Sequence, residues 1–340
     1  MANKPDEGFC IYGVEVISRY LQALKAELEG VRLAQDIEYI HRMRVASRRL
    51  RSALPLFEAC FPQKRYSYWI KHIRKVTRSL GAARDMDVQL EELNKFFEED
   101  ASPAYKAGLL RLKLRLSQQR AVAQEKIITT LDAIDQEGVL TDLEDYLAPS
   151  LARSNLTYPY TPFVYQKSYE SIATRVEELL SYEPYVDHPE AVTELHAMRI
   201  AAKRLRYTME IFAPIYPGEL KSYLQTVRKI QDMLGELHDA DVWIAFLPDF
   251  LQKERAFTQE YYGHTRTFHR LIAGIEAFLV DRQAARQEHY QDFVQLWRKS
   301  ASQNTWDSLL TATRIPYFQG ESHGTAQDQV PPSPASEQIG

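Results

Sequence analysis

A charged helical pattern occurs twice in this chain. His41 starts a segment in which basic residues follow at steps of three, seven and ten, and His196 starts a second segment with the same steps, 155 residues later. A solvated helix face needs charge but no fixed order of charges, so two copies of one spacing indicate a function. We call these positions the basic arcs: His41, Arg44, Arg48 and Arg51 in the first copy, and His196, Arg199, Lys203 and Arg206 in the second.

The helical wheel separates the basic arcs from a core face. Because an α-helix turns by about 100° per residue, the four positions of one copy fall within about 80° of each other. Met43, Leu50 and Leu54 lie on the opposite side and are expected in the core, whereas Arg42 and Arg49 fall outside the arc. Each arc is thus a cationic ridge about 15 Å long. Repulsion between its charges calls for an anionic partner, either an internal carboxylate or a ligand.

Composition predicts an all-α protein. Only 13 of the 340 residues are glycine, and long proline-free stretches are rich in helix-forming residues. The net charge of −4 excludes a general polycation effect, so an anion site must arise from local clustering.

Cys10 and Cys60 permit at most one disulfide, and we expect a reduced, cytosolic setting. Neither a run of about 18 apolar residues nor a signal-peptide pattern occurs, so we expect a soluble protein with no membrane partner.

The repeat extends on both sides of the basic arcs. Upstream, 9–28 and 163–180 are each expected to form a first helix, and downstream 104–131 and 261–297 are each expected to form a long helix. About four helices per half are enough for a four-helix bundle, and two repeats are too few for a solenoid. We therefore predict two four-helix bundles related by a pseudo-two-fold axis, with a basic groove between them.

These bundles define the predicted domain organisation. A single domain spans 9–310, with a first half of about 9–150 and a second half of about 160–310. Residues 318–340 are polar and rich in proline and glycine, which predicts a disordered tail.

A second motif is also duplicated. A pair of cations is followed by Leu-Gly and then by two aspartates, and it supplies four further site candidates: Arg74, Lys75, Arg228 and Lys229. The glycines, Gly81 and Gly235, are expected to allow a close helix contact or to end a helix. The aspartate pairs are Asp85/Asp87 and Asp239/Asp241. Each pair is expected to cap a helix or to orient arginines, and we favour these roles over metal binding.

The two histidines have three interpretations. Each could be a neutral side chain packed at the helix start, a cation held protonated by bound phosphate, or a phosphoacceptor. Val45 and Ile200 stand where a phosphoacceptor would need small neighbours. No His, Cys, Asp or Glu lies three or four residues after either histidine, so no metal is expected. We favour a role facing a ligand.

Other sequence signals argue against catalysis and against nucleic acid. The chain lacks a glycine-rich phosphate loop, a His-Glu-x-x-His motif and a recognisable nucleophile setting. The 20 tyrosines and the other aromatic residues are not interleaved with the basic arcs, although single-stranded nucleic acid needs stacking platforms beside the cations. A ridge of cations alone suits a polyanion without bases.

With both motifs present in both halves, the chain resembles the CHAD family, named for its conserved histidine α-helical domain. The resemblance covers about residues 9–310 and implies two four-helix bundles whose basic residues line a central cavity. It also implies binding of inorganic polyphosphate without enzymatic activity. The family's histidine corresponds to His41 and His196, and its basic positions to the rest of the basic arcs and to Arg74 and Arg228. The Glu-x-Glu-x-Lys motif of the triphosphate-tunnel domain that often precedes CHAD domains is missing here.

We therefore predict a non-catalytic, cytoplasmic protein that binds inorganic polyphosphate and needs no cofactor, with association with polyphosphate granules as a further expectation. Two alternatives stay open: a histidine phosphotransfer or other phosphate-handling enzyme, and a scaffold for acidic proteins or nucleic acid. Chain-length preference, affinity, oligomeric state and physiological role do not follow from the sequence.

Overall fold

The computed structural model describes residues 6–34, 36–99, 102–154 and 159–322, and every regular element in these ranges is a helix. The all-α prediction is confirmed. The first half contains α1 (Glu7–Lys25), α2 (Leu28–Leu33), α3 (Ile37–Leu56), α4 (Gln63–Glu99), α5 (Lys106–Gln136) and α6 (Val139–Ser154). The second half contains α7 (Pro162–Leu180), α8 (Val192–Phe212), α9 (Lys221–Tyr262), α10 (His269–Ser302) and α11 (Thr305–Ser322).

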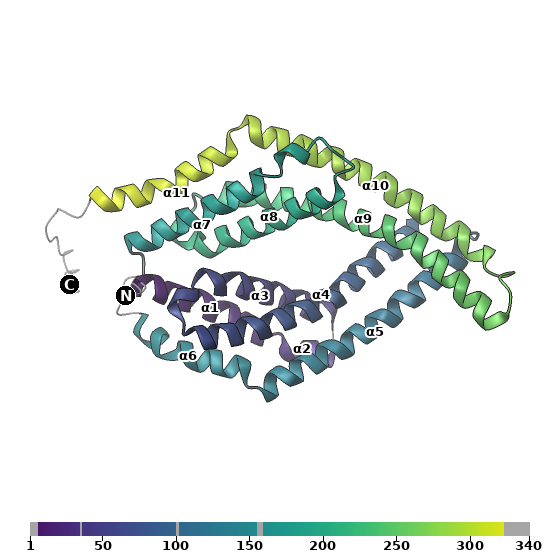
Figure 1. The fold of residues 1–340 in the computed structure, drawn as a ribbon, viewed down its shortest axis with the longest axis horizontal. Coiled ribbons are helices and arrows are strands. Elements are labelled where there is room, and N and C mark those ends of the chain that lie inside the picture. Colours follow the sequence, from purple (N-terminus) through teal and green to yellow (C-terminus); the bar gives the residue numbers. More distant parts are fainter. Residues whose placement is uncertain (1–5, 35, 100–101, 155–158, 323–340) are drawn as a thin grey trace, which may run out of the picture.

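The two halves have corresponding helix packing (Figure 1). In the first half α1 packs on α3, α3 on α4, α4 on α5, and α6 returns to α1. In the second half α7 packs on α8, α8 on α9, α9 on α10, and α11 returns to α7. Each half therefore has one long helix more than the four expected, because the segment after the long return helix folds back as α6 or α11.

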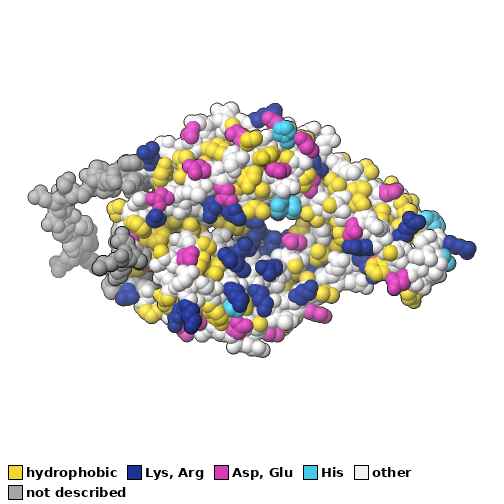
Figure 2. Space-filling view, in the orientation of Figure 1, with side chains coloured by type: hydrophobic (Ala, Val, Ile, Leu, Met, Phe, Trp, Pro, Cys, Tyr) yellow, Lys and Arg dark blue, Asp and Glu magenta, His cyan; other side chains and the backbone are white. Residues whose placement is uncertain are grey.

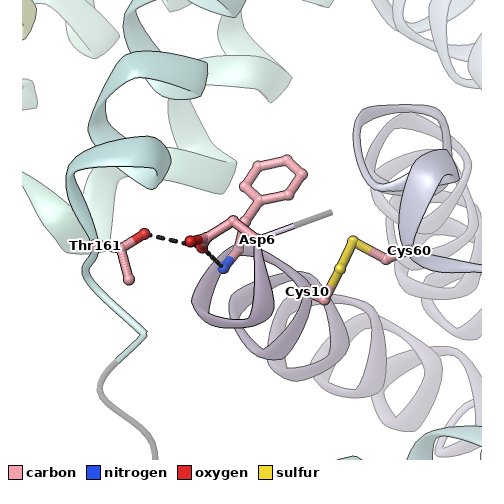
Figure 3. The surroundings of a disulfide bond; sticks show 5 residues. Asp6, Cys10, Cys60 and Thr161 are labelled. Atoms are coloured by element: carbon pink, nitrogen blue, oxygen red, sulfur yellow. Dashed lines mark hydrogen bonds between the residues drawn. A yellow bond between two sulfur atoms is a disulfide. The ribbon is translucent and has the colours of Figure 1, made fainter. Parts of the chain in front are cut away.

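The N-termini of the two halves meet. Asp6 caps α1 by accepting a hydrogen bond from the Phe9 amide at 2.7 Å, and Thr161 caps α7. The Thr161 hydroxyl also donates to the Asp6 carboxylate at 3.0 Å, so the caps of two corresponding helices are bonded to each other (Figure 3). Further along, the Tyr12 hydroxyl donates to the carbonyl oxygen of Ile211 on α8. These contacts hold α1 of the first half against α7 and α8 of the second half, and so fix the two halves relative to one another at this end.

At the opposite end the halves share a second apolar core. The distal parts of α4, α5, α9 and α10 converge there, and we call this four-helix arrangement the distal bundle (Figure 1). Trp243 and Phe278 are fully buried among leucines of both halves. At the crossing of α5 and α10, a Cβ on Gly108 would lie 2.3 Å from the carbonyl oxygen of Leu271, so the contact requires glycine.

A buried ion pair reinforces the distal bundle. Glu254 of α9 is only 2% exposed and accepts hydrogen bonds from Arg111 and Arg115 of α5, at 2.8 and 2.6 Å. Because α5 belongs to the first half and α9 to the second, this triad fastens the halves together. Fastened at both ends, the halves enclose the region where the basic arcs lie.

The structure corrects the expectation for the cysteines. Cys10 of α1 and Cys60 of the short η1 helix (Glu58–Cys60) form a disulfide (Figure 3). Their Cα atoms lie 5.4 Å apart, a separation typical of disulfides, although 50 residues separate them in sequence. We had expected a reduced pair, because the sequence gives no sign that the end of α3 returns to the start of α1.

Several predicted boundaries also shift. The long helix expected at 104–131 is α5, which runs on to Gln136. Tyr261 lies in the last turn of α9, which ends at Tyr262, and the next long helix, α10, begins only at His269. The first residues of the predicted tail, 318–322, lie in α11, and 323–340 lie outside the described residues. None of the described helices is long and apolar enough to cross a bilayer.

Candidate anion-binding site

The basic arcs of the two halves meet where α3 and α8 contact each other. A larger apolar core lies apart from that of the distal bundle, and the apolar faces of both helices are fully buried in it. They include Met43 and Leu50 on α3, and Met198 and Leu205 on α8. The basic arcs must therefore face away from that core, as the helical wheel predicts. Lys203 on α8 is close enough to the arginines of α3 to feel their charges.

A cavity of about 680 Å³ opens between α3 and α8. Cations from both halves line it, and no carboxylate does. Figure 2 shows dark blue side chains gathered around a hollow between the two halves. We call it the central cavity, and its charged lining residues are Arg48, Arg51, Arg74, Arg175, Lys203 and Arg204.

Most of these cations lack a carboxylate partner. Among the described residues, none lies within ion-pair distance of Arg48, Arg51, Arg74 or Lys203, whereas Arg175 and Arg204 share Glu178. Burial and the neighbouring arginines lower the pKa of Lys203 to about 7. Unpaired cations held together in a half-buried cavity repel one another, and a bound anion would relieve that repulsion.

A second cavity, lined by residues of the second half alone, has a different charge. This cavity has a volume of about 400 Å³, and its charged lining residues are Arg206, Lys221, Arg228 and Glu210. Glu210 forms ion pairs with Arg49 at 3.0 Å and with Arg206 at 3.7 Å. In the first half, proline occupies the position that corresponds to Glu210. The central cavity therefore keeps its positive charge, while the second cavity is partly neutralised from within.

The two histidines of the basic arcs have unequal surroundings. His196 contacts His238 of α9, with 2.9 Å between the two Nδ1 atoms, so one ring donates and the other accepts. His41 has Arg84 as its neighbour in place of a second histidine. Burial, followed by nearby arginines, lowers the pKa of both His41 and His196, and burial lowers the pKa of His238 to about 4. Without a bound anion, these histidines are neutral at pH 7.

The aspartate pairs orient arginines and do not cap helices. Asp85 lies inside α4 and pairs with Arg44 at 3.4 Å, and buried Asp87 accepts from Arg120 of α5 at 2.6 Å. In the second half Asp241 pairs with Arg286 of α10. The capping alternative is therefore wrong, because α4 and α9 continue through the motif without a break.

The motif glycines lie inside the long helices, opposite the first arginine of each basic arc. A Cβ on Gly81 would lie 4.0 Å from Nε of Arg44, and one on Gly235 would lie 3.7 Å from Nε of Arg199. They leave room for these guanidinium groups and do not end a helix. Asp239, next to Arg199, has its pKa raised by burial to about 6, although Arg199 opposes that rise.

Not every candidate residue reaches a cavity. Arg74 lines the central cavity and Arg228 the second one, but Lys75 and Lys229 are exposed and line neither. Four members of the basic arcs also line neither cavity: His41, Arg44, His196 and Arg199. The wheel analysis missed Arg204, which corresponds to Arg49, because a residue outside the arc of its own helix can still face the partner helix. It also missed Arg175, whose helix α7 lacks the repeated charge pattern.

The fold and the site define an all-helical protein whose two corresponding halves enclose a cavity lined by arginines. A model of the CHAD domain matches residues 15–248, more than half of the chain, and the chain therefore belongs to the CHAD domain family. Two Mycobacterium tuberculosis proteins, MT2285 and Rv2226, are each 26% identical to it over 212 residues, which are 62% of this chain and 40% of theirs. The chain thus matches less than half the length of these curated relatives.

Two solved structures share the fold. The CHAD domain from the plant Ricinus communis has a TM-score of 0.55 and 24% identity, with 91% of each chain covered. PptA from Streptomyces chartreusis has a TM-score of 0.58 and 15% identity, with 86% of this chain and 99% of PptA covered. At these identities the likeness concerns the fold alone.

Proposed function

We propose that this protein binds inorganic polyphosphate in the central cavity and does not process it. The observation that carries this proposal is that six cations from both halves line one cavity and no carboxylate does. Five of the six are arginines, whose planar guanidinium groups match phosphate oxygens in bidentate fashion. Membership of the CHAD domain family supports the same ligand, because the family is associated with polyphosphate.

The size and lining of the cavity favour a polyanion over other ligands. Its volume of about 680 Å³ lies within the usual range for ligand sites, about 300–1,000 Å³. Tyr207 is the one aromatic residue in its lining, so bases of a nucleic acid would find few stacking platforms. A chain of phosphates needs charge and no stacking.

The absence of catalysis is part of the proposal. The residues that line the cavity include no carboxylate or histidine that could act as a general base on water. The alternative of histidine phosphotransfer is weakened by the setting of His196, whose Nδ1 is engaged with His238. Release of orthophosphate from polyphosphate, or acid-labile phosphate on a histidine after incubation with labelled ATP, would contradict this part.

Titration of the protein with long-chain polyphosphate at several salt concentrations tests the binding. If the four unpaired cations each contact one phosphate, the log–log slope of affinity against salt should be about −3, since each contact on a single strand contributes about −0.7. A slope near zero would refute the site.

Two matched variants localise the binding. Arg48→Gln should weaken binding about tenfold or more at about 0.1 M salt, because Arg48 lines the cavity without an ion-pair partner. Arg42→Gln is the control: Arg42 is on the same helix but pairs with Glu27 at 2.9 Å, away from the cavity, and should change affinity less than about twofold. Equal losses in both variants would mean that bulk charge, and not the cavity, binds the chain.

A further inference from the structure

One basic residue in the central cavity differs chemically from the others. Lys203 is the only lysine in the two basic arcs, and its counterpart in the first half is Arg48. An arginine in a protein keeps its proton, whereas a lysine loses it readily when buried among cations. A lysine at this position therefore introduces an amine that can act as a nucleophile.

The surroundings of Lys203 favour the neutral amine. It is half-buried, it lines the cavity, and among the described residues it has no hydrogen-bond or ion-pair partner. The charged groups that act on it are Arg44, Arg48 and Arg51 of α3 and Arg199 of its own helix, and all are cations. His196 and His238 are also near it and are neutral. No carboxylate offsets these charges, and burial together with them holds the pKa of Lys203 near 7.

We propose that Lys203 is a site of covalent acylation by small acyl phosphates. Such a donor combines a phosphate group, which the guanidinium groups around the cavity would hold, with a carbonyl carbon that an uncharged amine attacks. The central cavity of about 680 Å³ is open and has room for a donor of the size of acetyl phosphate. Arg48 and Arg51 line the space for the reagent, and after burial they are among the charges that favour the uncharged amine.

The reaction balances without a further reagent. The lone pair of the Lys203 Nζ forms a bond to the carbonyl carbon, and a nearby guanidinium can stabilise the oxygen that becomes negative. The bond from this carbon to the phosphate oxygen then breaks, and the phosphate leaves with the bonding electron pair. The amine nitrogen releases one proton to the departing phosphate or to water. The products are an amide on Lys203 and inorganic phosphate.

Acylation would regulate the proposed polyphosphate site, and this consequence rests on the proposed function. The amide removes one of the unpaired cations of the central cavity, so polyphosphate affinity should fall by about five- to twentyfold. A bound polyphosphate chain would in turn protect Lys203, because it occupies the arginines and its many charges raise the pKa of the amine more than a single acyl phosphate does. Only the empty cavity would therefore be modified.

The test follows acetylation of the full chain by acetyl phosphate at pH 7.5, with mass spectrometry giving a rate for each lysine. Lys203 should react at least about tenfold faster than Lys106 and Lys113, which are exposed on α5 and lie outside the cavity. An uncharged acetyl ester serves as the matched donor. With the ester, the preference for Lys203 over the exposed lysines should shrink, because an uncharged donor has no phosphate group for the arginines to bind. Inorganic pyrophosphate should slow the reaction of Lys203 alone.

The possible outcomes separate the two proposals. A Lys203 rate no higher than that of the exposed lysines would overturn the acylation site, and an equal preference with both donors would overturn the choice of acyl phosphate. If Lys203 is selectively acetylated but long-chain polyphosphate gives no protection, acylation stands and the proposed polyphosphate site fails. The polyphosphate affinity of Lys203→Arg, whatever its value, should be the same before and after treatment with acetyl phosphate, because this variant has no amine at that position, whereas the affinity of the wild-type protein should fall.

Discussion

We predict that Glu210 limits how far a bound polyanion extends beyond the central cavity, so that its removal strengthens binding. The carboxylate of Glu210 pairs with Arg49 at 3.0 Å and with Arg206 at 3.7 Å beside the second cavity. Glu210→Gln keeps the shape of the side chain but releases both guanidinium groups. Two more cations then become available to a chain that passes from the central cavity toward the second one.

The size of this gain follows from counterion release. Each added phosphate contact contributes about 0.7 to the slope of log affinity against log salt, which is about fivefold in affinity at about 0.1 M salt. Two released arginines should therefore raise the affinity for long-chain polyphosphate by up to about 25-fold at that salt. At about 1 M salt the same term vanishes, and so should the gain. The loss in folding stability should be small, about 1 kcal/mol or less, because Arg49 and Glu210 are 40% and 22% exposed.

Binding of fluorescently labelled polyphosphate, followed by anisotropy at salt concentrations from about 0.1 to about 1 M, measures this effect. The control is Glu27→Gln, which releases Arg42 at a position away from both cavities and should leave affinity unchanged. A short chain that fits the central cavity alone should gain nothing from Glu210→Gln. The reasoning is refuted if long chains bind the variant no better at low salt, or if the gain persists at high salt.

Four further predictions concern titration and stability. Calorimetry at pH 8 in buffers of different ionisation enthalpy should show proton uptake when polyphosphate binds, and Lys203→Arg should abolish this uptake. Without the ligand, the free energy of unfolding should rise with pH from 7 towards about 10.5. The reason is that the unfolded chain, in which Lys203 has its ordinary pKa, holds more protons in this range than the folded protein does. Glu254→Gln should lower the free energy of unfolding by about 2 kcal/mol in urea titrations, because it weakens two charged hydrogen bonds in the distal bundle; no loss would mean that apolar packing alone joins the halves there. The double variant Cys10→Ser/Cys60→Ser should lose about 4 kcal/mol, as expected for a 50-residue loop, and added reductant should destabilise only the wild-type protein.

The sequence predicted the parts of this fold that depend on one helix at a time. The charge and apolar periodicities of α3 and α8 identified the buried faces and the basic arcs, because both follow from the geometry of a single helix. The repeat itself gave the correspondence of the halves. Arg48 and Lys203, predicted from these arcs, lie together in the central cavity.

Features that need two elements to meet could not be predicted. The wheel placed Arg49 and its counterpart Arg204 outside the basic arc, yet Arg204 lines the central cavity, because a cavity between two helices is wider than the arc of either one. Glu210 shows the same limit, since its ion pairs reach both halves. The distal bundle was missed as well: its leucines and aromatic residues continue the pattern of α4 and α9, and nothing in that pattern says which half they contact.

The two halves correspond in fold but differ in chemistry at three positions in or near the two cavities. Lysine replaces arginine at Lys203, histidine replaces Arg84 at His238, and glutamate replaces Pro55 at Glu210. Each change lowers the positive charge of the second half or makes it depend on pH, while the first half keeps permanent charge. A polyanion in the central cavity would therefore meet arginines alone on α3, and an arginine together with the titratable Lys203 on α8. Affinity for the chain then has a constant contribution from the first half and a contribution from the second that pH and acylation can change, which a symmetric pair of arginine ridges would not allow.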